Sequence, residues 1–171
     1  MKLLDLICEP YAQMLDALAG QLRKADQFAQ AKGFDFGVLL GARLAPDMYP
    51  LASQLRFVCI QAAEAIARVT GQPKVDTPEV ETLDGALSLL EATASRLREA
   101  QNVEALGEDS PVELDLRPGI VFDMSLGEYV RSWSLPQFYF HLNTAYAIMR
   151  HNGVDLGKAD YVPHAARFVR K

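Results

Sequence analysis

The chain has 171 residues, of which half are hydrophobic and 23% are charged, and its formal net charge is -5. This length and composition are typical of one folded domain with a substantial core, so we expect a single domain over residues 1–171. The acidic balance and the lack of a Lys/Arg patch with interleaved aromatic residues argue against a nucleic-acid partner. No apolar run approaches the roughly 18 residues that a membrane span needs, which argues against a membrane protein.

The N-terminal segment and the two cysteines bear on the compartment. Residues 1–8 include a short apolar run, but Asp5 interrupts it and no small-residue cleavage site follows. We interpret this segment as the start of a helix and not as a signal peptide. Cys8 and Cys59 lack metal-ligand spacing and lie on helical patterns. These patterns favour buried free thiols over a disulfide or a nucleophile, and they predict a cytoplasmic protein.

Apolar residues recur at helical spacing in four long segments, which predicts four amphipathic helices. The segments are residues 4–32 or 10–32, 50–70, 82–101 and 136–153. Gly33 and Gly71 directly follow the first two helices, where a glycine favours the left-handed turn that ends a helix.

Residues 33–50 form a long connection that is too apolar to be disordered, with a short helix expected near residues 38–44. The simpler interpretation is that this connection covers one end of the helices. The alternative is that it lines the mouth of a pocket, because loops of this length often carry binding residues.

Residues 112–116 and 120–124 alternate between polar and apolar side chains and flank the pair Pro118 and Gly119. Proline followed by glycine suits the central positions of a type II turn. The pattern predicts a short β-hairpin before the last long helix, with the apolar side chains pointing inward.

The last long helix is the most apolar of the four. Ser125 is expected to cap a short helix over residues 126–133, and Ser134 to cap the long helix that begins at Pro136. A helix that is apolar almost all the way round is usually buried in a bundle. It carries a single histidine in its first half, His141.

The three histidines do not form a metal-binding motif by themselves. His141 and His151 are ten residues apart, about 1,000° around an α-helix, so they face different directions. His164 lies in the tail. The motifs of serine hydrolases, phosphate-binding loops, dinucleotide folds and zinc proteases are missing from the sequence. From the residues alone, His141 is best explained as a hydrogen-bonded core histidine.

Two segments resemble one protein family. They are residues 42–51, ARLAPDMYPL, and residues 135–161, LPQFYFHLNTAYAIMRHNGVDLGKADY. Both resemble a bacterial family of unknown function in the DinB/YfiT-like superfamily of metalloenzymes. The resemblance implies an all-α fold: a four-helix bundle of up-down-down-up type with a long connection between helices 1 and 2, commonly dimeric.

The resemblance also implies a metal site that has lost ligands. In the superfamily, one histidine of helix 2 and two histidines of helix 4, four residues apart, bind a divalent metal. His141 matches the second histidine of helix 4, because it precedes Arg150 by nine residues and Gly153 by twelve. The other two positions fall at Gln137 and near Gln61. Since amide oxygens are weak ligands for zinc- or nickel-like ions, we expect no tightly bound metal, with a weak Zn or Ni site as the alternative.

Two functions remain open from the sequence. The preferred one is a non-catalytic or small-ligand-binding homodimer with a polar pocket floor and a rim from the long connection. The floor and rim residues are Gln61, Gln137, His141, Arg43, Asp47 and Tyr49. The alternative is a thiol transferase or hydrolase-type enzyme, as in characterised superfamily members, in which a metal lowers the pKa of a thiol or His141 acts as a base.

Overall fold

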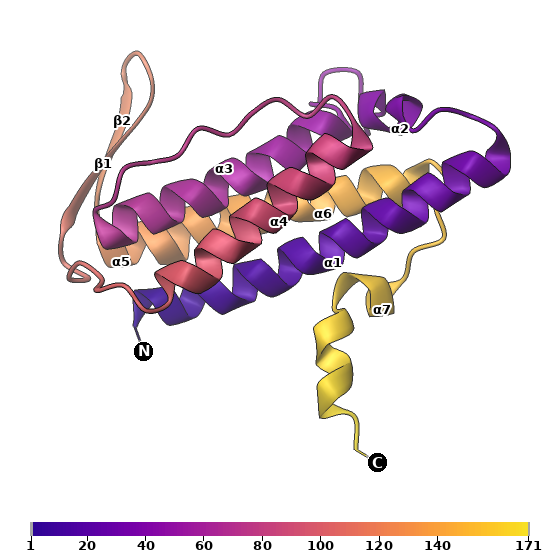
Figure 1. Ribbon diagram of the computed structural model, residues 1–171. Coiled ribbons are helices and arrows are strands. Elements are labelled where there is room, and N and C mark those ends of the chain that lie inside the picture. The colour runs from indigo at the N-terminus through magenta and orange to yellow at the C-terminus, as the bar shows by residue number, and fades with distance from the viewer. Residues whose placement is uncertain (1, 171) are drawn as a thin grey trace.

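The computed structural model describes residues 2–170, and helices dominate it (Figure 1). The helices are α1 (Leu3–Lys32), α2 (Gly37–Gly41), α3 (Leu51–Thr70), α4 (Leu83–Ala100), α5 (Leu126–Glu128), α6 (Leu135–His151) and α7 (Lys158–Tyr161). A π-helix (Tyr129–Ser134) joins α5 to α6, and a 3-10 helix (Pro163–Phe168) follows α7. Strands β1 (Pro111–Arg117) and β2 (Ile120–Ser125) form one antiparallel pair. The four long helices expected from apolar periodicity are therefore confirmed.

The four long helices lie side by side and bury their apolar stripes against one another (Figure 1). α1 packs mainly on α4, and α3 packs on both α6 and α4. α3 runs from the α2 end of the molecule toward the hairpin, and α6 runs back in the opposite direction (Figure 1). Removal of these stripes from water is the main stabilising contribution. Among residues 2–170, every helix falls short of the length and apolar character that a membrane crossing needs.

The connection between α1 and α3 covers one end of the long helices. α1 ends at Gly33, whose φ of 75° is left-handed, and the N–H groups of Gly33 and Phe34 bond back to the last turn of the helix. The short helix α2 then buries Leu39 and Leu40 against the core. This placement agrees with the simpler interpretation of the connection, although Tyr49 near its end contacts two residues of α3, Gln54 and Phe57, that also contact His141 of α6.

The hairpin forms where predicted, with Gly119 at a φ of 84° in its turn. The prediction that all its apolar side chains point inward is wrong, since Leu116 is 43% exposed and Phe122 is 41% exposed. Only Val112 and Leu114 near the base are buried. The physical reason is that the hairpin extends past the ends of the helices, so no second layer covers its tip (Figure 1).

Ser125 caps α5 as predicted: its hydroxyl accepts a hydrogen bond from the N–H of Glu128. The prediction that Ser134 caps the next helix is wrong. Ser134 has helical φ and ψ angles of -60° and -51°, and its hydroxyl is buried 2.9 Å from that of Tyr11. The chain stays helical because the π-helix connects α5 to α6 immediately before Pro136, the residue whose missing N–H would interrupt an α-helix.

Candidate functional site

His141 lies in the middle of α6 and is half-buried against the start of α3. Its Nδ1 is 2.8 Å from Oε1 of Gln54, a residue in the first turns of α3 that is only 2% exposed. The other end of this amide, Nε2 of Gln54, donates a hydrogen bond of 3.1 Å to the backbone carbonyl of Tyr49. The antiparallel course of α3 and α6 brings these residues together, because the start of α3 faces the middle of α6.

Aromatic rings surround much of the imidazole. The ring centroid of Phe57 lies 5.1 Å from that of His141, and the ring of Phe140 lies at 5.3 Å. Tyr49 packs edge-on against Phe57 at 5.0 Å. Burial lowers the pKa of His141 from 6.5 to about 4, because the charged form would lose hydration among these rings. The imidazole is therefore neutral near pH 7.

The predicted rim residues all lie in the connection just before α3. The guanidinium of Arg43 donates to the backbone carbonyls of Pro46 and Met48 at 3.4 and 3.3 Å, so it braces the connection itself. Asp47 is exposed. Tyr49 is 62% exposed and reaches the His141 site through its carbonyl and its ring. The structure thus links Tyr49 to His141 and gives Arg43 a role in the shape of the rim.

The structure places Gln54, and not Gln61, beside His141. Gln61 follows Gln54 by two helical turns, or about 10.5 Å along the axis of α3. Because α6 runs the opposite way, this offset moves Gln61 toward the beginning of α6. Gln61 is half-buried, and its Oε1 is buried without a hydrogen-bond partner within residues 2–170. Gln137 is half-buried one turn before His141, as the sequence predicts.

Gln54 is the site residue that the sequence interpretation missed. Gln54 and Gln61 are seven residues apart and so lie on nearly the same side of α3. The periodicity predicts that both flank the apolar stripe, but it does not fix how far α3 is displaced along α6. The one available signal is that Gln54 lies three residues after the segment of residues 42–51 that resembles the family.

The residues around His141 do not fit a tightly held metal. Over the part of the chain that the structure describes, no three side chains of the His, Cys, Asp and Glu types converge in a way that could hold an ion. One imidazole and neighbouring amide groups are poor ligands for zinc or nickel. The Oε1 of Gln54 is moreover already engaged with His141.

Hollows in the surface occur elsewhere on the molecule. One of about 530 Å³ lies between residues 2–4 and the loop of residues 101–108. Another, of about 460 Å³, is mostly apolar and lies under residues 75–79, between α3 and α4. His141 lines neither of them. The candidate site is thus described by the side chains around His141 and is separate from these two hollows.

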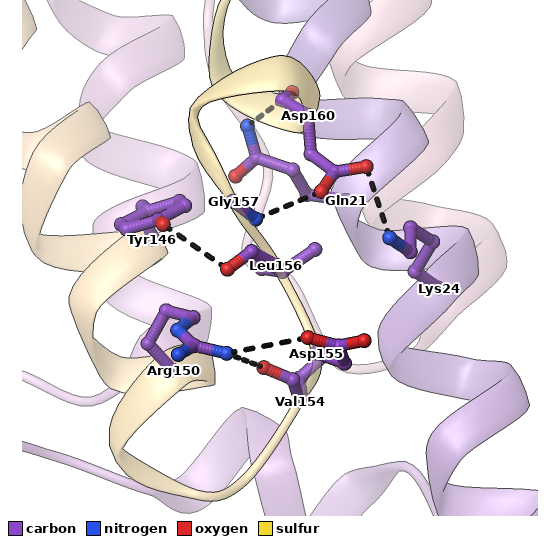
Figure 2. Close-up of polar contacts among 9 residues, drawn as sticks. All are labelled: Gln21, Lys24, Tyr146, Arg150, Val154, Asp155, Leu156, Gly157 and Asp160. Atoms are coloured by element: carbon purple, nitrogen blue, oxygen red, sulfur yellow. Dashed lines mark hydrogen bonds and ion pairs between the residues drawn. The ribbon is translucent and has the colours of Figure 1, made fainter.

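The residues whose spacing marks the family have a structural role after α6. Gly153 adopts a φ of 95°, which turns the chain, and Arg150 donates to the carbonyl of Val154 at 3.0 Å (Figure 2). The same guanidinium lies 3.7 Å from the carboxylate of Asp155. Arg150 therefore closes the turn that Gly153 makes.

The segment that follows is tied to both α6 and α1 (Figure 2). Tyr146 of α6 donates to the carbonyl of Leu156 at 3.3 Å. On the α1 side, Gln21 donates to the backbone carbonyl of Asp160 at 3.1 Å, and Lys24 lies 3.0 Å from its carboxylate. These contacts hold the end of α6 against α1 and so fix the position of the helix that carries His141.

Four long packed helices with a hairpin before the last one define a mostly helical protein of the DinB-like class. A crystal structure described as a DinB family member protein from Shewanella denitrificans has a similar fold, with a TM-score of 0.79 and 33% sequence identity. The match covers 94% of this chain and 91% of that chain.

The particular family follows from the sequence. Residues 3–162 match the family described as "Domain of unknown function (DUF1993)", and the chain belongs to this family. No curated protein matches the chain. The resemblance to a bacterial family of unknown function in the DinB-like superfamily is thus confirmed.

Proposed function

We propose that this protein is a non-catalytic, small-ligand-binding member of its class, a single-domain four-helix bundle whose binding site centres on His141. The observation that carries the proposal is the hydrogen bond between His141 and the buried Gln54, at a place where a metalloenzyme would need further imidazole ligands. Gln137, one turn before His141, and the rim residues Arg43, Asp47 and Tyr49 complete the proposed site. In this proposal Gln54 replaces Gln61 as the glutamine of helix α3 that forms the polar floor of the site beside His141.

The alternative, a thiol transferase or hydrolase-type enzyme, has less support. Burial raises the pKa of the Cys8 thiol to about 11 and that of Cys59 to about 12, so neither side chain supplies a thiolate at neutral pH. His141, with a pKa near 4, is a weak general base. The residues of the site therefore favour binding over catalysis.

The metal content of the protein tests the proposal that the site has lost the ligands needed to hold a metal. We expect protein purified without a polyhistidine tag to contain much less than one equivalent of zinc, nickel or iron. We expect the His141→Ala variant to contain the same amount, because a single imidazole holds such ions weakly. Stoichiometric metal in the wild type that disappears in this variant would favour the enzyme alternative and contradict the proposal.

Ligand-observed NMR with a library of small aromatic alcohols and amines tests binding itself. We expect a subset of these compounds to bind the wild type and to lose binding when His141 is replaced by Phe, which keeps the aromatic packing but removes both ring nitrogens. The His151→Phe variant, altered at the exposed end of the same helix, serves as the matched control. Binding that survives His141→Phe would place the ligand site elsewhere and refute the proposal.

We also propose that the protein is a cytoplasmic homodimer without nucleic-acid partners. The exposed aromatic rings of Tyr49 and Phe140, beside the site, supply apolar surface of the kind that protein interfaces use. Light scattering coupled to size exclusion is expected to give twice the chain mass at micromolar concentration. A monomer mass at high concentration would contradict the dimer but would leave the binding proposal intact.

A further inference from the structure

The buried amide of Gln54 has only one orientation that satisfies its neighbours. One end lies 3.1 Å from the backbone carbonyl oxygen of Tyr49, and a carbonyl oxygen only accepts hydrogen bonds. That end must therefore be the NH₂ group. The other end, which faces His141, must be the amide oxygen. Because Gln54 is 2% exposed, water does not offer alternative partners for a flipped amide.

The orientation of this amide determines which nitrogen of the imidazole carries the proton. An amide oxygen only accepts, so Nδ1 of His141 must donate across the 2.8 Å contact. A neutral imidazole carries one proton, and its other nitrogen then carries a lone pair. We infer that Gln54 is a positioning residue that keeps the proton of His141 on Nδ1 and presents Nε2 as a hydrogen-bond acceptor.

The surroundings of the imidazole agree with this assignment. Nε2 makes no hydrogen bond within residues 2–170, and the side chain that carries it is half-buried and not enclosed. The rings of Phe57 and Phe140 pack against the imidazole, with centroids 5.1 and 5.3 Å from its own. The inference rests on the proposed function in one respect: it defines the ligand as a molecule with an O–H or N–H donor beside an apolar body.

The tautomer of His141 can be measured directly by ¹H–¹⁵N correlation NMR of the imidazole in the ligand-free protein near pH 7.5. The His141→Asn variant assigns the signals. A histidine side chain in water prefers the tautomer with the proton on Nε2, so we expect the folded protein to show the reverse preference. Gln54→Met, which keeps the shape but removes the acceptor, should shift the population back toward the Nε2–H form. Gln61→Met, the same change two turns further along α3, should leave the tautomer unchanged.

A wild-type spectrum with the proton on Nε2, or with a mixture of tautomers, would overturn the inference. The same holds if Gln54→Met keeps the Nδ1–H form. If Gln54→Met does not fold, Gln54→Glu replaces it. A carboxylate still accepts a hydrogen bond from Nδ1, so we expect Nδ1 to remain protonated in this variant. An unprotonated Nδ1 would refute the inference. Because no ligand is present in any of these measurements, their failure is distinct from a failure of the proposed ligand binding.

Discussion

Acidification should destabilise this protein through His141. Its pKa is about 4 in the folded protein and returns to an ordinary value of 6.5 when the chain unfolds. Between these values the unfolded chain binds a proton that the folded protein does not bind, so the free energy of unfolding falls as the pH falls. Above about pH 6.5 the residue is neutral in both states and contributes nothing. Below about pH 4 it is protonated in both states and the loss is complete.

The size of this effect follows from the two pKa values. Each pKa unit corresponds to about 1.4 kcal/mol, so the complete loss is at most about 3 kcal/mol, and solvent that reaches the half-buried side chain reduces it. Between pH 7.5 and 5.0 the loss is at most about 2 kcal/mol, because most of the unfolded chains but few of the folded ones are protonated at the lower pH. Against a typical stability of roughly 5–15 kcal/mol, such a change is readily measured.

Urea unfolding followed by circular dichroism at several pH values is the assay, with wild type compared to His141→Asn. Asn does not titrate, yet its side-chain NH₂ can still donate to Gln54. The carboxylates of Glu128 and Asp160 have lowered pKa values in the folded protein, so they too lose stabilising interactions as the pH falls, but equally in both proteins. Their effect cancels in the difference. The His151→Asn variant controls for the loss of one exposed histidine.

The expected result is that the wild type loses roughly 1–2 kcal/mol more than His141→Asn between pH 7.5 and 5.0, the upper figure applying if solvent does not screen the imidazole. His151→Asn should follow the wild type. If the wild type and His141→Asn show the same pH dependence, then the imidazole is not shielded from water as the structure indicates.

Three further predictions concern buried polar groups. Tyr11→Phe removes a hydroxyl that is hydrogen-bonded in the core and should cost about 1–2 kcal/mol in urea unfolding. Tyr129→Phe removes a buried hydroxyl that makes no hydrogen bond of ordinary geometry within residues 2–170, although Ser134 and Arg68 lie near it, and should cost clearly less; equal losses would contradict this. Gln61→Met should raise the unfolding free energy by roughly 1 kcal/mol, since it removes a buried oxygen that has no hydrogen-bond partner in the described part of the chain. A clear loss of stability would show that this oxygen is hydrogen-bonded. Cys8 and Cys59 should react with a thiol reagent only at the rate of unfolding, and rapid reaction of the native protein would show that one of them is accessible.

The apolar periodicity predicts the long helices well because each helix buries one stripe over many turns. α1 and α3 end at Gly33 and Gly71, as the sequence indicates, because each glycine adopts the left-handed conformation that other residues avoid. These features depend on residues close together in the sequence. The local pattern alone is enough to specify them.

The errors concern contacts between distant segments. Ser134 is a good capping residue by type, but Tyr11, 123 residues earlier, binds its hydroxyl in the core and the helix continues through it. In the hairpin, apolar residues alternate as expected, but Phe122 stays 41% exposed because Trp133 of the π-helix covers only part of it. Local sequence predicts which conformations a segment favours, whereas contacts with distant segments decide which of them it adopts in the fold.

In the candidate site, too, local features are predicted from the sequence and contacts between distant segments are not. His141 and Tyr49 were found from the sequence, since each lies in a segment that resembles the family. Gln54 is not predicted from the sequence, because its hydrogen bond to His141 depends on how far α3 is displaced along α6. A shift of two turns exchanges Gln54 for Gln61 without altering the pattern of apolar residues on either helix. Only the three-dimensional structure fixes which of the two glutamines meets the imidazole.

Arg150 and Gly153, whose spacing from His141 marks the family, do not themselves give the site its chemistry. Arg150 and Gly153 close the turn after α6, and their contacts hold that helix in place. They constrain the position of His141, but they say nothing about the groups that surround it. What the imidazole can do depends on Gln54 and on the neighbouring aromatic rings, which hold it neutral and direct its proton toward α3. A likeness in the turn thus supports the fold strongly, whereas the function has to be argued from the amide and the rings.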